Sequence, residues 1–336
     1  MILQPSVLAL LVADGVAVLF LAMATLFALR LLKGWDLGSG SALQLQLERR
    51  TYLVSTLLTF ALATQLIALL LLVFNADRMS EYFVGAMCAV GSFNAHPWGF
   101  PALMLRLGLF FLAGTWLVTN YLDNQHPRYP LIRPKYALIL PTLLLAVTTG
   151  GLQLGYFLGL EGDLSAVITS CCGALFSVDA KTVASELSGS PPDIMMGIFY
   201  LTMALVVGGG IWVSRSHRGF RPLALLGVAA LVVGIAAVIS FISLYLYEHP
   251  HHHCPFCLLK PEYNYFGYLL YIPLFLATAL NLGVGFSSQF LRGEVREAIL
   301  PIHGAKLIRW TVVLYLLFTL FATLAVVQSN LILLES

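Results

Sequence analysis

Long apolar stretches recur along the whole chain and are separated by shorter polar segments. A helix that crosses a membrane needs about 20 mostly apolar residues, and eight stretches meet this requirement. The pattern predicts an all-α, polytopic integral membrane protein with about eight transmembrane helices. The predicted spans cover residues 5–31, 51–74, 102–122, 137–160, 194–214, 222–247, 265–290 and 307–331.

The connections between these spans differ in their basic charge. Fourteen of the 18 Lys and Arg residues follow an odd-numbered span. Because cytoplasmic connections carry the excess of Lys and Arg, the N- and C-termini and the even-numbered connections are predicted to be outside. We expect residues 1–336 to form a single transmembrane helix-bundle domain, whose external loops 75–101, 161–193 and 248–264 form a cap that carries cysteine and histidine.

The composition narrows the class of protein further. Hydrophobic residues make up 59% of the chain and charged residues only 10%, whereas a typical soluble domain carries about 25% charged residues. This balance excludes a soluble enzyme, a disordered protein and a secreted disulfide scaffold. The net charge of +2 gives no reason to expect nucleic acid, and the chain has no phosphate-binding Gly-x-x-x-x-Gly-Lys-Ser/Thr loop for a nucleotide. We expect a multi-pass protein of the bacterial inner membrane, embedded in the lipid bilayer.

Two ionisable residues lie within predicted spans near their outer ends. Asp14 is about nine residues into the first span, and Arg106 is about one turn into the third. Intramembrane charges are costly and face protein or a cavity, so Asp14 is a candidate for a proton or cation relay, or for a hydrogen-bonded structural acid. Arg106 is expected to extend to the interface or to pair with Asp14. No histidine falls in the middle of a span, so we expect no haem b within the bilayer.

All the cysteines fall in predicted external loops, although cysteine is a comfortable core residue. They are Cys88, Cys171, Cys172, Cys254 and Cys257. Histidines accompany them: His96 follows the first cysteine by eight residues, and residues 249–257 read HPHHHCPFC. The odd number of cysteines leaves at least one sulfur outside any set of internal disulfides. We therefore expect a thiol–histidine site on the external, periplasmic face.

Cys254 and Cys257 are separated by two residues, a spacing that suits either a reducible disulfide or a soft metal ion. Our first hypothesis is electron transfer, in which this pair is active at the start of the seventh span. Cys171 and Cys172, or one of them with Cys88, would then relay electrons by thiol–disulfide exchange. The chain would be a membrane thiol–disulfide oxidoreductase that exchanges electrons with quinone or with a periplasmic redox protein.

In its placement, Cys254-x-x-Cys257 resembles the motif of disulfide-generating quinone reductases and vitamin K epoxide reductases. Those proteins also set a Cys-x-x-Cys at the outer start of a spanning helix and carry a second cysteine pair in an external loop. They have four or five spans and this chain has eight, so the resemblance covers the motif alone. It implies a quinone pocket among aromatic residues that an interfacial belt would equally contain: Tyr263, Tyr265, Phe266, Tyr268 and Tyr271.

A second hypothesis is the binding or transport of a soft metal such as copper or zinc, which thiolate and imidazole ligands both suit. The partner would then be a periplasmic metallochaperone. A third interpretation makes the chain a subunit of a larger membrane complex that docks an external redox protein, with the cysteines as structural disulfides. Under the second hypothesis, metal binding, the predicted ligands are His251, His252, His253, Cys254, Cys257 and His96.

Overall fold

Helices account for nearly all the regular structure of the chain, and no β-strand is present in the described residues. The computed structural model describes residues 2–36, 41–160 and 191–331. Eight helical segments are long and apolar enough to cross a membrane, as the sequence predicted. They cover Pro5–Gly34, Ala42–Ser80, Gly99–Asp123, Ile132–Gly159, Pro192–Ser216, Phe220–Tyr247, Phe266–Ser287 and Gly293–Gln328.

These helices belong to two compact units, each built from segments that are distant in the sequence. Unit 1 comprises Met1–Asn75, His96–Gly162 and Phe286–Gly304, and unit 2 comprises Ala76–Ala95, Asp163–Gly285 and Ala305–Ser336. Because each unit interleaves several segments of the chain, residues far apart in sequence can meet within one unit.

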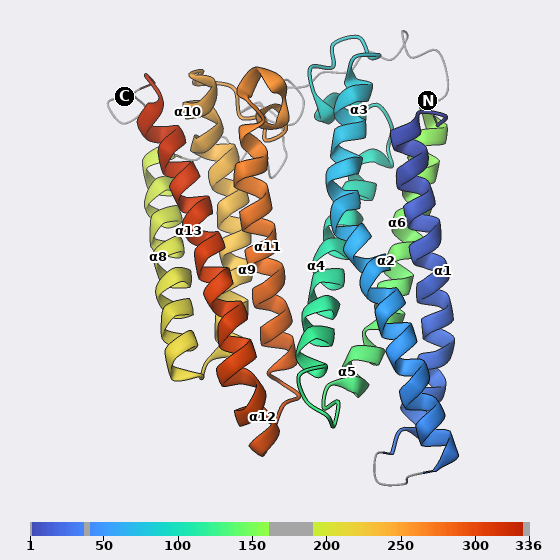
Figure 1. Cartoon of the computed structure of the whole chain (residues 1–336). Helices are drawn as coiled ribbons and strands as arrows, with labels where there is room; N and C mark the ends of the chain where they lie inside the picture. The colour runs from blue at the N-terminus through green and yellow to red at the C-terminus, as the bar shows by residue number, and fades with distance from the viewer. Residues whose placement is uncertain (1, 37–40, 161–190, 332–336) are drawn as a thin grey trace. The chain divides into compact units, whose positions relative to one another are not determined.

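The long helices α1, α2, α4 and α6 form most of unit 1 (Figure 1). Their packing is dense: α6 contacts both α1 and α4 along its length. Two shorter elements from late in the chain complete the unit, α12 and the π-helical turn η5. The helices are α1 (Pro5–Gly34), α2 (Ala42–Ser80), α4 (Gly99–Asp123), α5 (Ile132–Ala137), α6 (Ile139–Gly159), α12 (Gly293–Ile299) and η5 (Leu300–Gly304).

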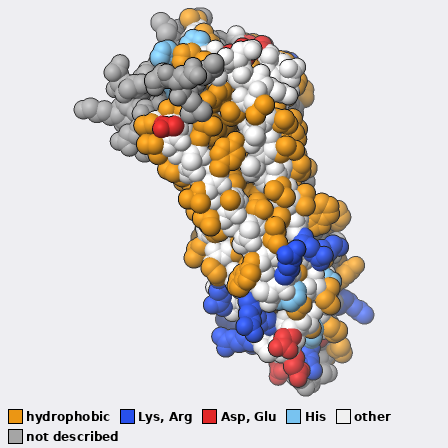
Figure 2. Space-filling view, turned by 90° about the vertical axis from the view of Figure 1, so that its left-hand side faces the viewer, with side chains coloured by type: hydrophobic (Ala, Val, Ile, Leu, Met, Phe, Trp, Pro, Cys, Tyr) orange, Lys and Arg blue, Asp and Glu red, His pale blue; other side chains and the backbone are white. Residues whose placement is uncertain are grey.

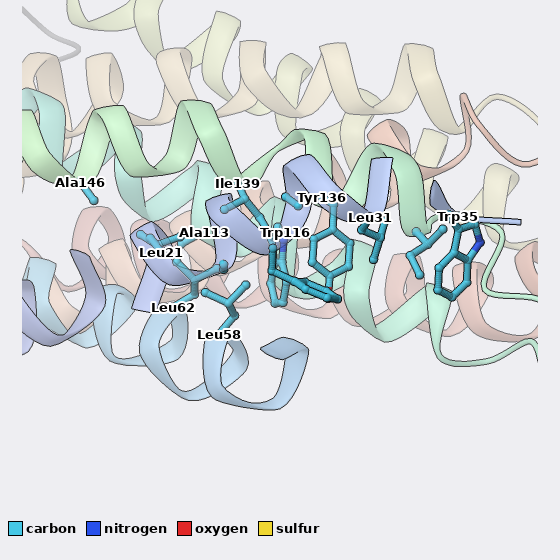
Figure 3. Close-up of a cluster of buried hydrophobic side chains, with 14 of the residues drawn as sticks. Leu21, Leu31, Trp35, Leu58, Leu62, Ala113, Trp116, Tyr136, Ile139 and Ala146 are labelled. Atoms are coloured by element: carbon cyan, nitrogen blue, oxygen red, sulfur yellow. The ribbon is translucent and has the colours of Figure 1, made fainter. Parts of the chain in front are cut away.

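Large side chains fill the space between the helices of unit 1 (Figure 3). Trp116 is fully buried, and its indole Nε1 donates a hydrogen bond to the backbone oxygen of Lys135 at 3.1 Å. The Phe27 and Tyr136 rings meet edge to face, with centroids 5.7 Å apart. Since lipid is as apolar as these side chains, close packing and hydrogen bonds rather than removal from water hold such helices together.

Unit 2 contains the other spanning helices and a set of short elements at their ends (Figure 1). Helix α8 packs along both α9 and α13, and the Phe199 ring contacts the rings of Phe241 and Phe318 at 5.7 Å each. The elements are α3 (Ala89–Asn94), α8 (Pro192–Ser216), α9 (Phe220–Ala237), the π-helical turn η2 (Val238–Ile242), α10 (Ser243–Tyr247), η3 (Cys257–Leu259), η4 (Pro261–Tyr263), α11 (Phe266–Ser287) and α13 (Ala305–Gln328).

The surface of the molecule carries the signature of a membrane environment. Figure 2 shows hydrophobic side chains over the middle of one face, with Lys and Arg gathered towards one end. Exposed leucines recur along the spanning helices, among them Leu19, Leu26 and Leu320. An apolar surface of this extent is unfavourable in water and is what a lipid bilayer covers. The chain is therefore a multi-pass membrane protein.

Candidate functional site

Three cysteine sulfurs converge in unit 2. The Sγ atoms of Cys88, Cys254 and Cys257 all lie within 4.8 Å of one another. The Sγ atoms of Cys88 and Cys254 are 3.5 Å apart, at hydrogen-bond distance. All three residues are at least 97% buried. The arrangement joins residues that are 166 positions apart in the chain into one compact group of soft ligands.

Cys88 is presented by a short turn that ends in extended backbone. It immediately precedes α3 and has φ −158° and ψ −175°. Gly85, three residues earlier, has φ +83°, a conformation that glycine adopts without steric cost. The Phe93 ring of α3 contacts the ring of Phe256, with centroids 6.0 Å apart. Because Phe256 lies between the other two cysteines, this contact holds the two segments of the site together.

Two tyrosines fix the backbone of the loop that carries the other cysteines. The Tyr247 hydroxyl donates to the backbone oxygen of Cys254, and the Tyr271 hydroxyl donates to that of Pro255, each at 2.6 Å. Cys257 then begins the 3₁₀ turn η3. Gly267 of α11 allows this turn to pack closely, since a Cβ there would lie 2.9 Å from the Cβ of Leu258.

A π-helical turn in the membrane-spanning helix supplies a further anchor for this loop. In η2 the backbone N–H of Ser243 reaches the carbonyl of Val238, five residues back. The buried His253 ring places Nδ1 2.9 Å from the carbonyl oxygen of Ile239. A π-turn widens a helix locally and is frequent at functional sites. Here it provides the carbonyl that holds the residue next to Cys254.

The predicted histidine ligands lie outside the group of three sulfurs. His251 is exposed, and the His252 ring stacks on Tyr247 with centroids 4.2 Å apart. The His253 ring contacts the backbone oxygen of Ile239 through Nδ1. His96 belongs to unit 1, where its ring meets those of Trp98 and Tyr156. The predicted site residues Cys171 and Cys172 lie outside the described residues.

The electrostatics of the loop follow from burial and from contacts between the thiols. The hydrogen bond with Cys257 raises the pKa of Cys254 above its usual value, burial adds to this, and the contact with Cys88 opposes it. Burial disfavours the charged form of the histidines too, and it therefore lowers the pKa of His252 and His253. These rings are neutral at neutral pH. Without a bound cation, the Cys254 side chain is therefore a thiol rather than a thiolate.

The intramembrane charges Asp14 and Arg106 meet in unit 1. Arg106 Nη2 lies 2.8 Å from both carboxylate oxygens of Asp14 and donates to Gln153 Oε1 at 3.0 Å. Arg106 Nη1 donates to Gln65 Oε1. The group draws one side chain from each of α1, α2, α4 and α6. Its closed geometry gives Asp14 the character of a paired carboxylate that ties four helices together.

A second buried ion pair, which sequence reasoning missed, lies towards the opposite end of α4. Lys135 Nζ is 2.5 Å from Asp123 Oδ2 and also donates to Asn120 Oδ1 at 3.3 Å. Both charged side chains are fully buried. Lys135 follows Arg128 and Arg133 in sequence, so it reads as one more cation of a cytoplasmic connection, and only its position in three dimensions identifies it as an intramembrane group.

The arrangement of three sulfurs allows either metal ligation or thiol–disulfide chemistry. Both need soft, mutually close sulfur atoms, and the site provides three of them. No family model, no curated protein and no solved structure matches this chain. Its function is accordingly inferred from the chemistry of its own residues.

Proposed function

We propose that this protein binds a soft metal ion, such as copper(I) or zinc(II), at a tris-cysteine centre formed by Cys88, Cys254 and Cys257. The observation that supports this proposal is the convergence of their three Sγ atoms within 4.8 Å of one another. Thiolate ligands select copper(I) and zinc over harder ions. The proposal covers binding, whereas transport across the membrane would need a further set of ligands along the spans.

The separations between the sulfurs suit a metal–thiolate centre. In a tetrahedral zinc site the Zn–S bonds of about 2.3 Å place neighbouring sulfurs about 3.8 Å apart. The separation of 3.5 Å between Cys88 and Cys254, and the upper limit of 4.8 Å for the group, lie on either side of this value. Small side-chain rotations are enough to form the centre, and three protein ligands leave a fourth position for a ligand that exchanges.

The burial of the sulfurs favours metal binding over exchange with a protein partner. Reactive cysteines are partly exposed and lie in electropositive surroundings, whereas buried thiols are inert. Here none of the three cysteines Cys88, Cys254 and Cys257 is more than 3% exposed. A cation bound among the sulfurs would supply the charge that allows them to ionise in a buried position, because a coordinating thiol loses its proton to the metal.

A thiol–disulfide relay is the second candidate, and the 3.5 Å contact between Cys88 and Cys254 favours it. In this reaction the Cys88 thiolate attacks Cys254 of a Cys254–Cys257 disulfide. A Cys88–Cys254 bond forms, the older bond breaks, and Cys257 leaves as a thiolate that takes up the proton lost by Cys88. Net oxidation of two thiols would need a two-electron acceptor, either a quinone or a disulfide of a periplasmic redox protein.

The cellular setting of the proposal follows from the distribution of basic residues. The excess of Lys and Arg in the other connections supports an external location of the cysteine loops, which in a bacterial inner membrane is the periplasmic side. A periplasmic metallochaperone is the partner expected for a copper or zinc centre on that face. The alternative partner, for a relay, is a periplasmic redox protein or the rest of a membrane complex.

The proposal is tested on protein purified without oxygen in detergent. Equilibrium dialysis against copper(I) or zinc(II) should give one tightly bound ion per chain, and cobalt(II) should give the intense near-ultraviolet charge-transfer band of thiolate ligation. Serine at any of the three cysteines should weaken binding at least tenfold. Ser92→Ala removes one polar atom from the same buried segment and serves as the matched control, with binding unchanged.

The two candidate functions give different outcomes in the same preparation. A native protein that retains no metal, gives no cobalt band and shows alkylation of the three cysteines only after reduction would overturn the metal proposal and support the relay. Retained metal together with alkylation that depends on a chelator, not on a reductant, would exclude the relay.

A further inference from the structure

A cavity of about 690 Å³ lies within unit 1, between α2 and α4. Its size falls in the range of small-molecule sites, about 300–1,000 Å³. The lining residues all belong to unit 1, and none of them takes part in the cysteine site. They are Trp35, Glu48, Thr51, Tyr52, Ser55, Thr56, Thr59, Phe60, Leu117, Asn120, Tyr121, Asn124 and Tyr129.

The lining combines aromatic rings with uncharged polar groups. Five of its members are Trp, Tyr or Phe, and six are Ser, Thr or Asn. Glu48 is the single Asp, Glu, Lys or Arg among the lining residues. Pockets that bind anionic lipid headgroups are basic, so this lining does not suit a phosphate. Flat rings and neutral hydrogen-bonding groups suit a neutral ligand that is itself ring-shaped.

The hydroxyl groups along α2 define what the ligand must offer. Those of Ser55, Thr56 and Thr59 donate to carbonyl oxygens of their own helix at 2.7–3.1 Å. Thr59 Oγ1 also accepts from Asn120 Nδ2 at 3.1 Å, so Ser55 and Thr56 are the hydroxyl groups that present lone pairs to a ligand. Thr51 differs: it is 95% buried, and its Oγ1 has no hydrogen-bond partner among the described residues. A buried hydroxyl without a partner is unfavourable, and a ligand acceptor would satisfy it once the Thr51 side chain rotates to turn Oγ1 into the cavity.

The cavity wall on α4 is hydrogen-bonded to two ionisable side chains, His303 and Lys135. Tyr121 lines the cavity, and its hydroxyl lies 3.3 Å from Nδ1 of His303. His303 belongs to the π-helical turn η5. Asn120, also in the lining, accepts a hydrogen bond from the buried Lys135. A ligand whose oxygens gain and lose protons would therefore have both a tyrosine–histidine pair and a buried cation close to its site.

We infer that this cavity binds a lipid-soluble quinone or quinol. The ring would lie against the aromatic side chains. In the oxidised form a ring carbonyl accepts from Thr51, and in the reduced form a ring hydroxyl donates to the lone pairs of the α2 hydroxyl groups. The cavity lies along the apolar spans α2 and α4, where a ligand can enter from lipid. This inference concerns binding and is independent of the metal proposal.

The test uses a short-chain benzoquinone with the full-length protein in detergent. Quinones quench tryptophan fluorescence on contact, and Trp35 lines the cavity. We expect saturable quenching that Trp35→Phe largely abolishes. Thr51→Val, which removes one hydrogen bond, should weaken binding about fivefold to tenfold. Thr64→Val is the matched control, because Thr64 lies on the same helix, is exposed and is absent from the lining; its affinity should be unchanged.

Photo-crosslinking with an azidoquinone supplies a readout that needs no variant. Label on peptides from α2 or α4 that contain lining residues supports the inference. Label confined to other helices would overturn it, as would quenching that does not saturate or that is identical in Trp35→Phe. Displacement of the bound quinone by phosphatidylglycerol at equal concentration would identify the cavity as a lipid site and would equally overturn the inference.

Discussion

The buried pair of Asp14 and Arg106 gives the sharpest test of how unit 1 is held together. In Arg106→Met, the carboxylate of Asp14 and the side-chain oxygens of Gln65 and Gln153 all lose their guanidinium donors. The Arg106 side chain is fully buried and that of Asp14 is 8% exposed, so water can replace the lost donors only in part. Breaking a buried pair on one side costs about 3–5 kcal/mol.

This cost corresponds to a large shift in the unfolding equilibrium. Since about 1.4 kcal/mol is a factor of ten, Arg106→Met should favour the unfolded state by about a hundredfold to a few thousandfold. Asp14→Leu should cost a similar amount, because it leaves a buried cation without its counter-ion. The double variant should be less destabilised than either single variant, since an apolar pair leaves no unpaired charge in the interior.

Reversible unfolding by sodium dodecyl sulfate in mixed micelles, followed by circular dichroism and tryptophan fluorescence, measures these free energies. Arg309→Met is the matched control, because Arg309 is exposed on α13 and surface changes stay within about 0.5 kcal/mol. Additive costs in the double variant, or an Arg106→Met protein as stable as the native one, would refute the assignment of Asp14 as a paired carboxylate.

Three further changes probe other parts of the structure. Gly267→Ala introduces a Cβ 2.9 Å from Leu258; overpacking of this kind costs about 1–3 kcal/mol, and the affinity for metal should fall together with the melting temperature. Tyr271→Phe removes one hydrogen bond from the cysteine loop and should cost about 1 kcal/mol in the same unfolding assay, while the melting temperature of Tyr265→Phe should not change. Lys135→Met leaves Asp123 buried without its cation and should cost about 3–5 kcal/mol; pairing this change with Asp123→Leu should recover part of the loss.

The fold was predictable from the sequence because a membrane span is specified by length and hydropathy alone. Twenty apolar residues in succession have few alternatives to a transmembrane helix, since lipid offers no partner for backbone groups. The two π-helical turns were not predictable in this way. The turn at Val238–Ile242 lies in a mostly apolar part of the chain, and its contact with His253 is made across 14 positions.

The candidate site was only partly predictable, because hydropathy predicts how deep a residue lies relative to the bilayer but not which residues it contacts in the folded chain. The predicted external location put Cys88, Cys254 and Cys257 on the same side of the membrane, which is a condition for contact between their sulfur atoms. Which sulfurs meet depends on how loops fold, and the structure gathers three of them while leaving the predicted histidines aside. The cavity of unit 1 was missed for the same reason: its hydroxyl groups are spaced along α2 like ordinary helix-packing residues.

The way in which the cysteine loop is anchored bears on how a metal would bind. Hydrogen bonds from Tyr247 and Tyr271 hold its backbone at Cys254 and Pro255, while the sulfur of Cys254 contacts those of Cys88 and Cys257 and accepts a hydrogen bond from the backbone of Phe256. The backbone is thus organised by the surrounding helices, and only side-chain rotation remains to be completed by the ion. A classical zinc finger, by contrast, folds only when metal binds. The free energy of metal–thiolate bonding would therefore contribute to the affinity for the metal and not to the folding of the chain. Removal of the metal should leave the helices intact.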